Sequence, residues 1–168
     1  GADHPDVADT LVNLARLLRE KGDLSGAEDL LRRSLAIDRR IHGEDHENVA
    51  YDLKELANLQ HDRGKTREAE ETYRQSLAMY RRTVAADSPY LAVILNGLGR
   101  TLLETGRPGE AEPLLRESLR IAGASLADDH WLILTSRSLL GAFLGATGRH
   151  PEGEPLVVRS YEGFSATL

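Results

Sequence analysis

The chain has 168 residues, 40% hydrophobic but only 5% aromatic, which suits one helical domain or a short array of helical repeats and leaves no room for two enzyme domains. The absence of cysteine excludes disulfides and thiolate chemistry, and a net charge of −6 argues against a general nucleic-acid binder, which needs a basic surface. No apolar run is long enough to span a membrane and no targeting segment opens the chain, so we expect a cytoplasmic protein that binds neither nucleic acid nor membranes.

The first predicted element is an amphipathic helix near residues 5–20. Pro5 suits the first helical position, where its missing N–H costs no hydrogen bond. Gly22 ends the helix, because glycine adopts the left-handed cap conformation without strain. Apolar residues recur at intervals of three and four, which is typical of one buried helix face. The residues predicted to face the core are Leu11, Leu14, Ala15 and Leu18.

A second helix is predicted near residues 24–41, before Gly43. Neither amphipathic helix can bury its apolar face alone, so the two are expected to pair as a hairpin that stacks against further hairpins. The residues predicted on the inner face of this second helix are Ala27, Leu31, Ser34 and Leu35.

The same pattern returns every 42 residues, so that the chain consists of four units, near residues 4–45, 46–87, 88–129 and 130–168. The remaining helices are expected near residues 47–63, 66–83, 89–105, 108–123, 131–147 and 151–164. We therefore predict an all-α fold, an α-solenoid of four helical hairpins that forms a single domain over residues 1–168. The invariant residues include Gly22, Gly64, Gly106 and Gly148, then Glu28, Glu70, Glu112 and Glu154, and then Ser34, Ser76, Ser118 and Ser160.

Small residues at facing positions predict that the two helices of each hairpin approach closely. Pro113 and Pro155 lie about five residues into their helices, where we expect a tilted first turn and no break. The facing positions hold Ala15, Ala57, Gly99 and Gly141 on one helix, and Ala27, Ala69, Ala111 and Gly153 on the other.

The segments His4-Pro5-Asp6-Val7-Ala8 and Gly43-Glu44-Asp45-His46, with Gly22 between them, resemble the tetratricopeptide repeat of the kinesin light chain type. The resemblance covers the whole chain and is weakest in the fourth unit, where Trp131 replaces the proline and Arg137 replaces a core leucine. It implies a right-handed superhelix whose first helices line a concave groove. It also implies a non-catalytic protein-protein interaction scaffold that binds a partner peptide or helix in that groove.

The alignment of the chain with its own repeat leads us to expect a fragment of a longer array. Residues 1–3 match Gly43, Glu44 and Asp45, the last residues of a unit. Leu168 falls one residue before the next glycine of the series would occur.

No group of residues in the sequence predicts an enzyme or a cofactor site. His42 and His46 lie close to Glu44 and Asp45, but Gly43 interrupts the helix between them, so a loop is expected here and not a metal site. The sequence therefore predicts no catalytic residue, no metal and no cofactor.

Two charged patterns are interpreted as helix surface. Glutamate and arginine recur four residues apart, the favourable spacing for an ion pair on one helix. Arginine pairs near the ends of second helices suit the helix dipole, with an anion or nucleic-acid site as the alternative. The residues are Glu28 with Arg32, Glu70 with Arg74, Glu112 with Arg116, Arg39 with Arg40, and Arg81 with Arg82.

The polar face of the first helices is the predicted partner-binding groove. Asparagine can both donate to and accept from a peptide backbone, and the cations would suit a carboxylate. We therefore expect a modest preference for an acidic partner segment, since Asp9 and Glu55 oppose it, and we expect Val12 on this face. The predicted groove residues are Asn13, Arg16, Tyr51, Lys54, Asn58, His61, Asn96 and Arg100.

A different class of function is a structural module that self-associates through the ends of the array. Exposed apolar residues at such an end could stack on another copy. The residues predicted to form this C-terminal edge are Leu156, Val157, Tyr161 and Phe164.

Overall fold

The computed structural model describes residues 4–166 and contains only helices and short connections over that range. Each predicted helix is present, and no boundary differs from its expected position by more than two residues. Residues 1–3 and Leu168, on which the expectation of a longer array rests, lie outside the described residues. The helices are α1 (Pro5–Glu20), α2 (Leu24–His42), α3 (Glu47–Asp62), α4 (Thr66–Thr83), α5 (Pro89–Glu104), α6 (Pro108–Ser125), α7 (Trp131–Ala146) and α8 (His150–Ala166).

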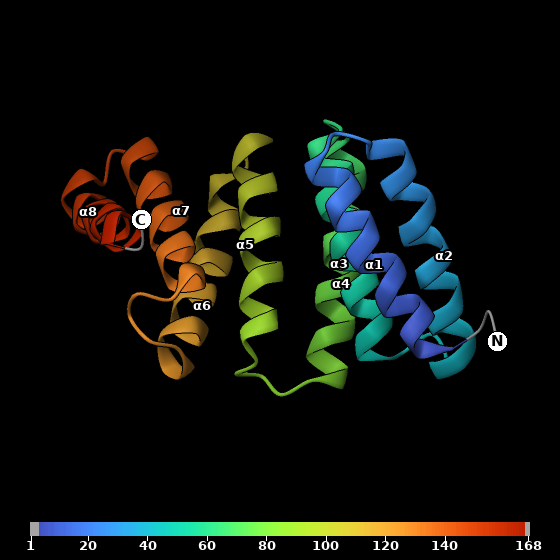
Figure 1. The fold of residues 1–168 in the computed structure, drawn as a ribbon. Coiled ribbons are helices and arrows are strands. Elements are labelled where there is room, and N and C mark those ends of the chain that lie inside the picture. The colour runs from blue at the N-terminus through green and yellow to red at the C-terminus, as the bar shows by residue number, and fades with distance from the viewer. Residues whose placement is uncertain (1–3, 167–168) are drawn as a thin grey trace. The chain divides into compact units, whose positions relative to one another are not determined.

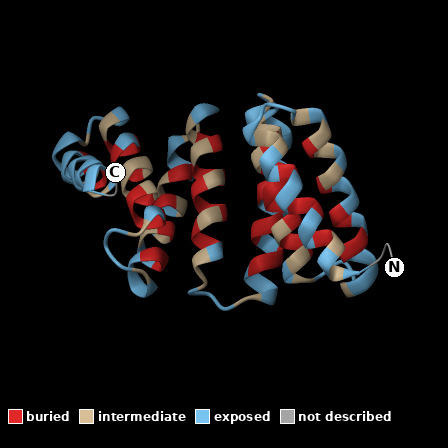
Figure 2. Ribbon diagram, viewed as in Figure 1, coloured by how far each residue is buried: buried red, intermediate tan, exposed pale blue. Residues whose placement is uncertain are grey.

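Consecutive helices pair as antiparallel hairpins, α1 with α2, α3 with α4, α5 with α6 and α7 with α8 (Figure 1). The chain divides into two compact units, Gly1–Val84 and Ala85–Leu168, each of which holds two hairpins. In the first unit α3 packs against α2 and α1, and in the second α7 packs against α6 and α5. Buried residues follow the helix faces that meet within each unit (Figure 2). The all-α repeat prediction is confirmed, whereas the single domain stays a prediction.

A repeated histidine begins three of the first helices. The Nδ1 atoms of His4, His46 and His130 accept hydrogen bonds from the backbone N–H two residues later, at 3.3, 3.2 and 3.2 Å. Each bond satisfies an N–H that the helix itself leaves without a partner. Ser88 occupies the same repeat position before α5 and makes no such side-chain bond.

A repeated serine forms a hydrogen bond between the two helices of each of the four hairpins. The hydroxyl of each serine donates to a backbone carbonyl 26 residues earlier, at 3.1, 2.6, 2.9 and 2.9 Å in the four hairpins. All four bonds are buried, so each one pairs a hydroxyl that would otherwise be desolvated without compensation. The pairs are Ser34 with Ala8, Ser76 with Ala50, Ser118 with Ala92, and Ser160 with Leu134.

The small residues permit the predicted close approach of the helices. A Cβ atom added to Gly153 would lie 2.7 Å from the carbonyl oxygen of Gly141, and one added to Gly99 would lie 2.6 Å from a methyl carbon of Leu115. Helices α6 and α8 continue through Pro113 and Pro155 without a break, as expected.

The prediction that Leu14 faces the core is wrong. Its side chain is 45% exposed, and Leu17 beside it is 55% exposed. Leu56, one repeat later on α3, is only 7% exposed, because α3 packs against the first hairpin. No hairpin precedes α1 within the described residues, so this face of the helix is left open. Val12, expected on the groove face, is instead buried at 3% exposure.

Arg137 takes the place of a core leucine in α7. Its guanidinium pairs with the Asp128 carboxylate and also donates to the Asp128 carbonyl oxygen at 3.1 Å. The side chain is 11% exposed, so this loop aspartate compensates a largely buried cation.

Candidate partner-binding surface

The predicted groove residues of the first unit lie on α1 and α3, two helices in direct contact. Asn13 and Arg16 of α1 are exposed, whereas Tyr51, Asn58 and His61 of α3 are partly buried. Ion pairs from Arg19 of α1 connect the two helices. Its Nη1 lies 3.4 Å from Oε2 of Glu55 and its Nε lies 3.3 Å from Oδ2 of Asp62. These contacts fix the polar faces of α1 and α3 beside one another.

Lys54 is not an open groove cation, which corrects the sequence prediction. It is 6% exposed, donates a hydrogen bond from Nζ to the carboxylate of Glu55, and places Nζ 4.0 Å from the ring centroid of Tyr51. Burial lowers the pKa of Lys54, and the neighbouring carboxylate opposes that shift. Burial alone would raise the pKa of Glu55, but Lys54 and the other donors around it bring that pKa below its usual value. The ion pair leaves no net charge for a ligand.

Asn58 belongs to the same buried network. Its Nδ2 donates to Oε2 of Glu55 at 3.3 Å, and its Oδ1 accepts a hydrogen bond from the hydroxyl of Tyr73 on α4. Donor and acceptor are therefore both used inside the protein. Asn58 therefore mainly connects α3 to α4 through its hydrogen bond with Tyr73.

The two predicted groove residues of the second unit are also buried or partly buried. Asn96 is 5% exposed and its Nδ2 donates to Oγ of Ser136 at 2.9 Å. Arg100 is partly buried, with Nε shielded from solvent. Asn96 is therefore buried, whereas the sequence analysis expected it to lie open on the groove face.

Arg16 remains as an exposed cation of this face. Its side chain makes no ion pair or hydrogen bond with the residues that the structure describes. It lies near enough to Lys54 for its positive charge to contribute to the lowered pKa of that side chain. Arg16, Asn13 and the partly buried Tyr51 and His61 thus form the part of the predicted groove that a partner can reach in the first unit. We call these four residues the α1–α3 polar face.

The structure contains a buried acidic cluster that the sequence analysis missed. Asp38 of α2 and Asp52 of α3 are 2% and 1% exposed, and each has one carboxylate oxygen without a hydrogen-bond partner. Burial raises the pKa of Asp52 to about 8, the nearby Ser34 hydroxyl opposes this, and the charges of Asp38 and other carboxylates add to it. Burial likewise raises the pKa of Asp38. One feature of the sequence could have indicated this cluster. The residue one repeat after Asp38 is Tyr80, so an aspartate stands at a position that holds an aromatic residue in the next unit.

The histidine cluster adjoins this acidic pair. The rings of His42 and His46 stack with centroids 4.0 Å apart, and Nε2 of His42 lies 3.9 Å from Oδ1 of Asp38. Nδ1 of His46 is occupied by the helix cap of α3. Within residues 4–166, no three histidine or carboxylate side chains are grouped as metal ligands would be.

The charged repeat positions form the expected ion pairs and also connect hairpins. Glu28, Glu70 and Glu112 pair with the arginine four residues later at 2.7, 2.9 and 2.9 Å. Glu28 also pairs with Arg63, and Glu112 with Arg149 at 2.6 Å, each from the next hairpin. Of the arginines near the ends of the second helices, Arg39 pairs with Glu44 and Arg82 pairs with Asp45.

Antiparallel hairpins repeated at 42 residues, with a fixed glycine turn and small residues at the crossing, define a helical repeat protein. Two family models, each described as a tetratricopeptide repeat, match residues 6–82 and 91–132, together well over half of the chain. The chain belongs to the tetratricopeptide repeat family. Comparison with curated proteins finds no significant match. Between residues 4 and 166, no helix is both long and apolar enough to cross a membrane.

Solved structures of kinesin light chain type are similar to this chain. A putative kinesin light chain of Podospora anserina with nearly identical repeats is 24% identical, with a TM-score of 0.72 over 99% of this chain and 79% of that one. BtubC (BKLC) from P. vanneervenii is 23% identical, with a TM-score of 0.82 over 98% of this chain and 66% of that one. MamA is 14% identical, with a TM-score of 0.66 over 97% and 81%.

Proposed function

We propose that this chain is a non-catalytic protein-binding scaffold whose α1–α3 polar face contacts a segment of a partner protein. Tetratricopeptide folds generally mediate protein-protein interaction. The observation that carries the finer proposal is Arg16, an exposed cation without an internal partner, whose charge acts on Lys54, the residue that lies over the ring of the partly buried Tyr51. An aromatic ring and an unpaired arginine are the side chains that most often dominate the free energy of binding at protein interfaces.

The chemistry of this face favours a partner segment that carries a carboxylate. Arg16 can form a two-pronged hydrogen bond with a carboxylate, and Asn13 can donate to and accept from a backbone. Because Lys54 is neutralised by Glu55 inside the protein, the preference rests on Arg16 and not on a row of cations. Asp9, which is exposed on α1, opposes it. The preference is therefore modest and weakens with added salt.

The direct experiment is affinity capture from the source cell with three proteins: the wild type, Arg16→Glu and Arg33→Glu. Arg33 is an exposed arginine of α2 and, like Arg16, makes no ion pair within the described residues. Both variants change the net charge equally, so only the position differs. The proposal predicts that Arg16→Glu loses a partner that the wild type and Arg33→Glu retain. Equal capture by all three proteins would contradict it.

A second candidate function is self-association through the ends of the array, which the exposed apolar residues favour. Val157, Tyr161 and Phe164 of α8 are 43%, 72% and 40% exposed, as expected for an uncovered edge, while Leu156 is partly buried. At the other end Leu14 and Leu17 of α1 are exposed. Exposed apolar side chains gathered on one face mark surfaces that other proteins cover.

A further inference from the structure

The last hairpin carries an open apolar pocket of about 410 Å³ where α7 and α8 come closest. Gly141, Gly153 and Val157 line it, together with Val158 and Glu154. In the other hairpins an arginine stands at the position of Val158, as in Arg32 of the first. The last hairpin therefore carries a short apolar side chain where the other three carry an arginine.

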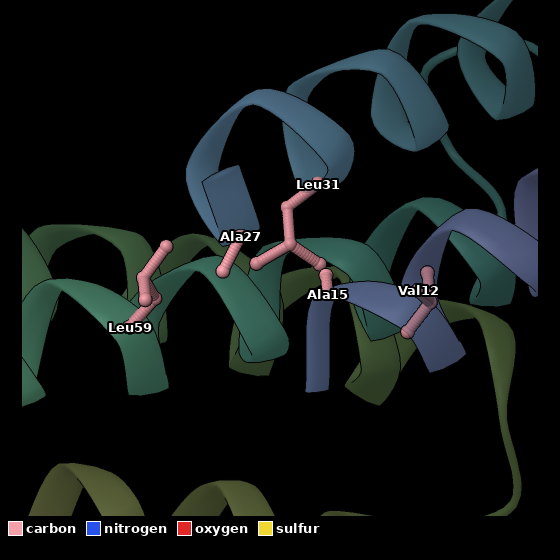
Figure 3. Packing of buried hydrophobic residues seen from close by; sticks show 5 residues of the cluster. All are labelled: Val12, Ala15, Ala27, Leu31 and Leu59. Carbon is pink, nitrogen blue, oxygen red and sulfur yellow. The ribbon is translucent and has the colours of Figure 1, made fainter. Parts of the chain in front are cut away.

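The same notch is filled in the first hairpin. Ala15, Ala27 and Leu31 are the repeat equivalents of Gly141, Gly153 and Val157. These three residues form one buried cluster with Val12 and with Leu59, which comes from α3 of the next hairpin and lies at the Ala27 end of the group in Figure 3. Leu59 is fully buried. The notch is thus a socket for a leucine of an adjoining first helix. We call the equivalent in the last hairpin the α7–α8 notch.

The chain itself offers the matching side chain at its other end. Leu17 of α1 stands one repeat before Leu59, at the same position of its helix. It is 55% exposed, whereas Leu59 has no exposed surface. Leu14 beside it is 45% exposed, whereas its equivalent Leu56 is 7% exposed. The face of α1 that carries these leucines is the repeat equivalent of the α3 face that packs on the first hairpin.

The face of α8 next to the notch also matches a covered face. Val157, Tyr161 and Phe164 follow one another at helical spacing and are all exposed. Their equivalents on α2 are Leu31, Leu35 and Asp38, at 3%, 8% and 2% exposure, where α3 packs against α2. A first helix laid on α8 in the same way would cover this apolar stripe.

The charges agree with the same register. Glu28 of the first hairpin pairs with Arg63, which follows α3. The equivalents of these two residues are Glu154 on α8 and Lys21 after α1. Neither side chain makes an ion pair or hydrogen bond with the described residues. Two unpaired opposite charges therefore stand where a repeated hairpin contact would bring them together.

We propose that a second copy of this chain docks the face of its α1 on α8, with Leu17 in the α7–α8 notch and Lys21 facing Glu154. This inference rests on self-association as the second candidate function and gives it a register. The contact joins two different surfaces, so each added copy leaves one surface open at either end, and assembly grows with concentration.

The test is light scattering over a concentration series for the wild type, Leu17→Glu, Val157→Glu and the control Trp131→Glu. Trp131 is as exposed as Leu17 and lies away from the notch. A carboxylate in an apolar notch should weaken association about tenfold or more. Wild type and Trp131→Glu are expected to grow in mass with concentration, and the other two variants to stay monomeric with unchanged circular dichroism. A wild type that stays monomeric, or a Trp131→Glu protein that loses association equally, overturns the proposal.

Mixing experiments test the register. Leu17→Glu retains the notch and Val157→Glu retains Leu17, so an equimolar mixture should form a dimer and stop there. Lys21→Glu should weaken wild-type association, and adding Glu154→Lys should restore it. A mixture that stays monomeric, or a swap that restores nothing, overturns the register. Partner capture by Val157→Glu, measured in parallel, separates the two functions, because this change leaves the α1–α3 polar face intact.

Discussion

Lys54 donates a hydrogen bond to the carboxylate of its neighbour Glu55 inside the first unit, where the two residues are 6% and 5% exposed. Arg19 and Asn58 complete the surroundings of that carboxylate. Glu55 thus joins α1 and α3, and its removal would leave a buried ammonium group without its counter-charge.

We therefore expect Glu55→Gln to lower the free energy of unfolding by about 3 kcal/mol, the usual result of leaving a buried ion without its partner. Lys54→Met should cost less, because Glu55 keeps Arg19 and Asn58 and a methionine suits a buried site. Urea denaturation of both variants, with the exposed Glu71→Gln as control, measures the difference. A larger loss for Lys54→Met than for Glu55→Gln would contradict this account.

The repeated serine makes a second prediction. Ser76→Ala removes the buried hydrogen bond to the Ala50 carbonyl and should cost about 1 kcal/mol. Ser25→Ala, at an exposed position of α2, should change the stability little. Thermal unfolding of the two variants provides the comparison. Equal midpoints for Ser76→Ala and the wild type would show that this bond does not hold the second hairpin.

Asp52 predicts how stability depends on pH. Because burial raises its pKa from 3.8 to about 8, the folded protein holds a proton between these values that the unfolded chain has lost. This group therefore makes stability fall as the pH rises from 4 to 8, the opposite of a salt-bridged carboxylate.

Asp52→Asn, which resembles the protonated acid, should flatten this dependence and raise the melting temperature most at pH 8 and above. Melting temperatures of the wild type and the variant, taken at intervals across this range, give the difference due to Asp52. Asp87→Asn, at an exposed loop position, is the control. Parallel curves for Asp52→Asn and the wild type would show that Asp52 is ionised in the folded protein.

The close approach of α7 and α8 allows a test with two glycines. Gly153→Ala should cost about 1 to 3 kcal/mol, because the added Cβ would lie 2.7 Å from a backbone oxygen. Gly123→Ala on α6 meets nothing within 4 Å and should stabilise the helix by about 0.5 to 1 kcal/mol. Chemical denaturation decides between opposite signs. A stabilised Gly153→Ala protein would mean that the crossing is looser than the structure shows.

The helices could be predicted because glycine, proline and the apolar period all point to the same boundaries. The burial of Lys54 and Asn96 could not be predicted from the sequence. A first helix has two buried faces, one toward its own hairpin partner and one toward a neighbouring first helix. A single apolar stripe accounts only for the first of these faces. The second face admits polar residues when they pair across helices, as Asn96 does with Ser136. Leu14 shows the converse, an apolar residue that is exposed because no hairpin precedes α1 within the described residues.

The partner-binding surface therefore contains fewer accessible residues than the sequence suggested. Of the eight groove positions, Asn13 and Arg16 alone are fully at the surface. Polarity indicated the correct helices, but it did not distinguish side chains that pair internally from those that remain open to a partner.

Contact between a partner segment and the α1–α3 polar face can be measured by isothermal titration calorimetry. The captured partner segment is titrated into the wild type, Arg16→Glu and Arg33→Glu at low and high salt. Reversal of the charge at Arg16 should weaken binding by about tenfold at low salt, with a smaller effect at high salt, while Arg33→Glu binds as the wild type does. Unchanged affinity for Arg16→Glu together with a loss for Arg33→Glu would contradict the claim and assign the contact to α2.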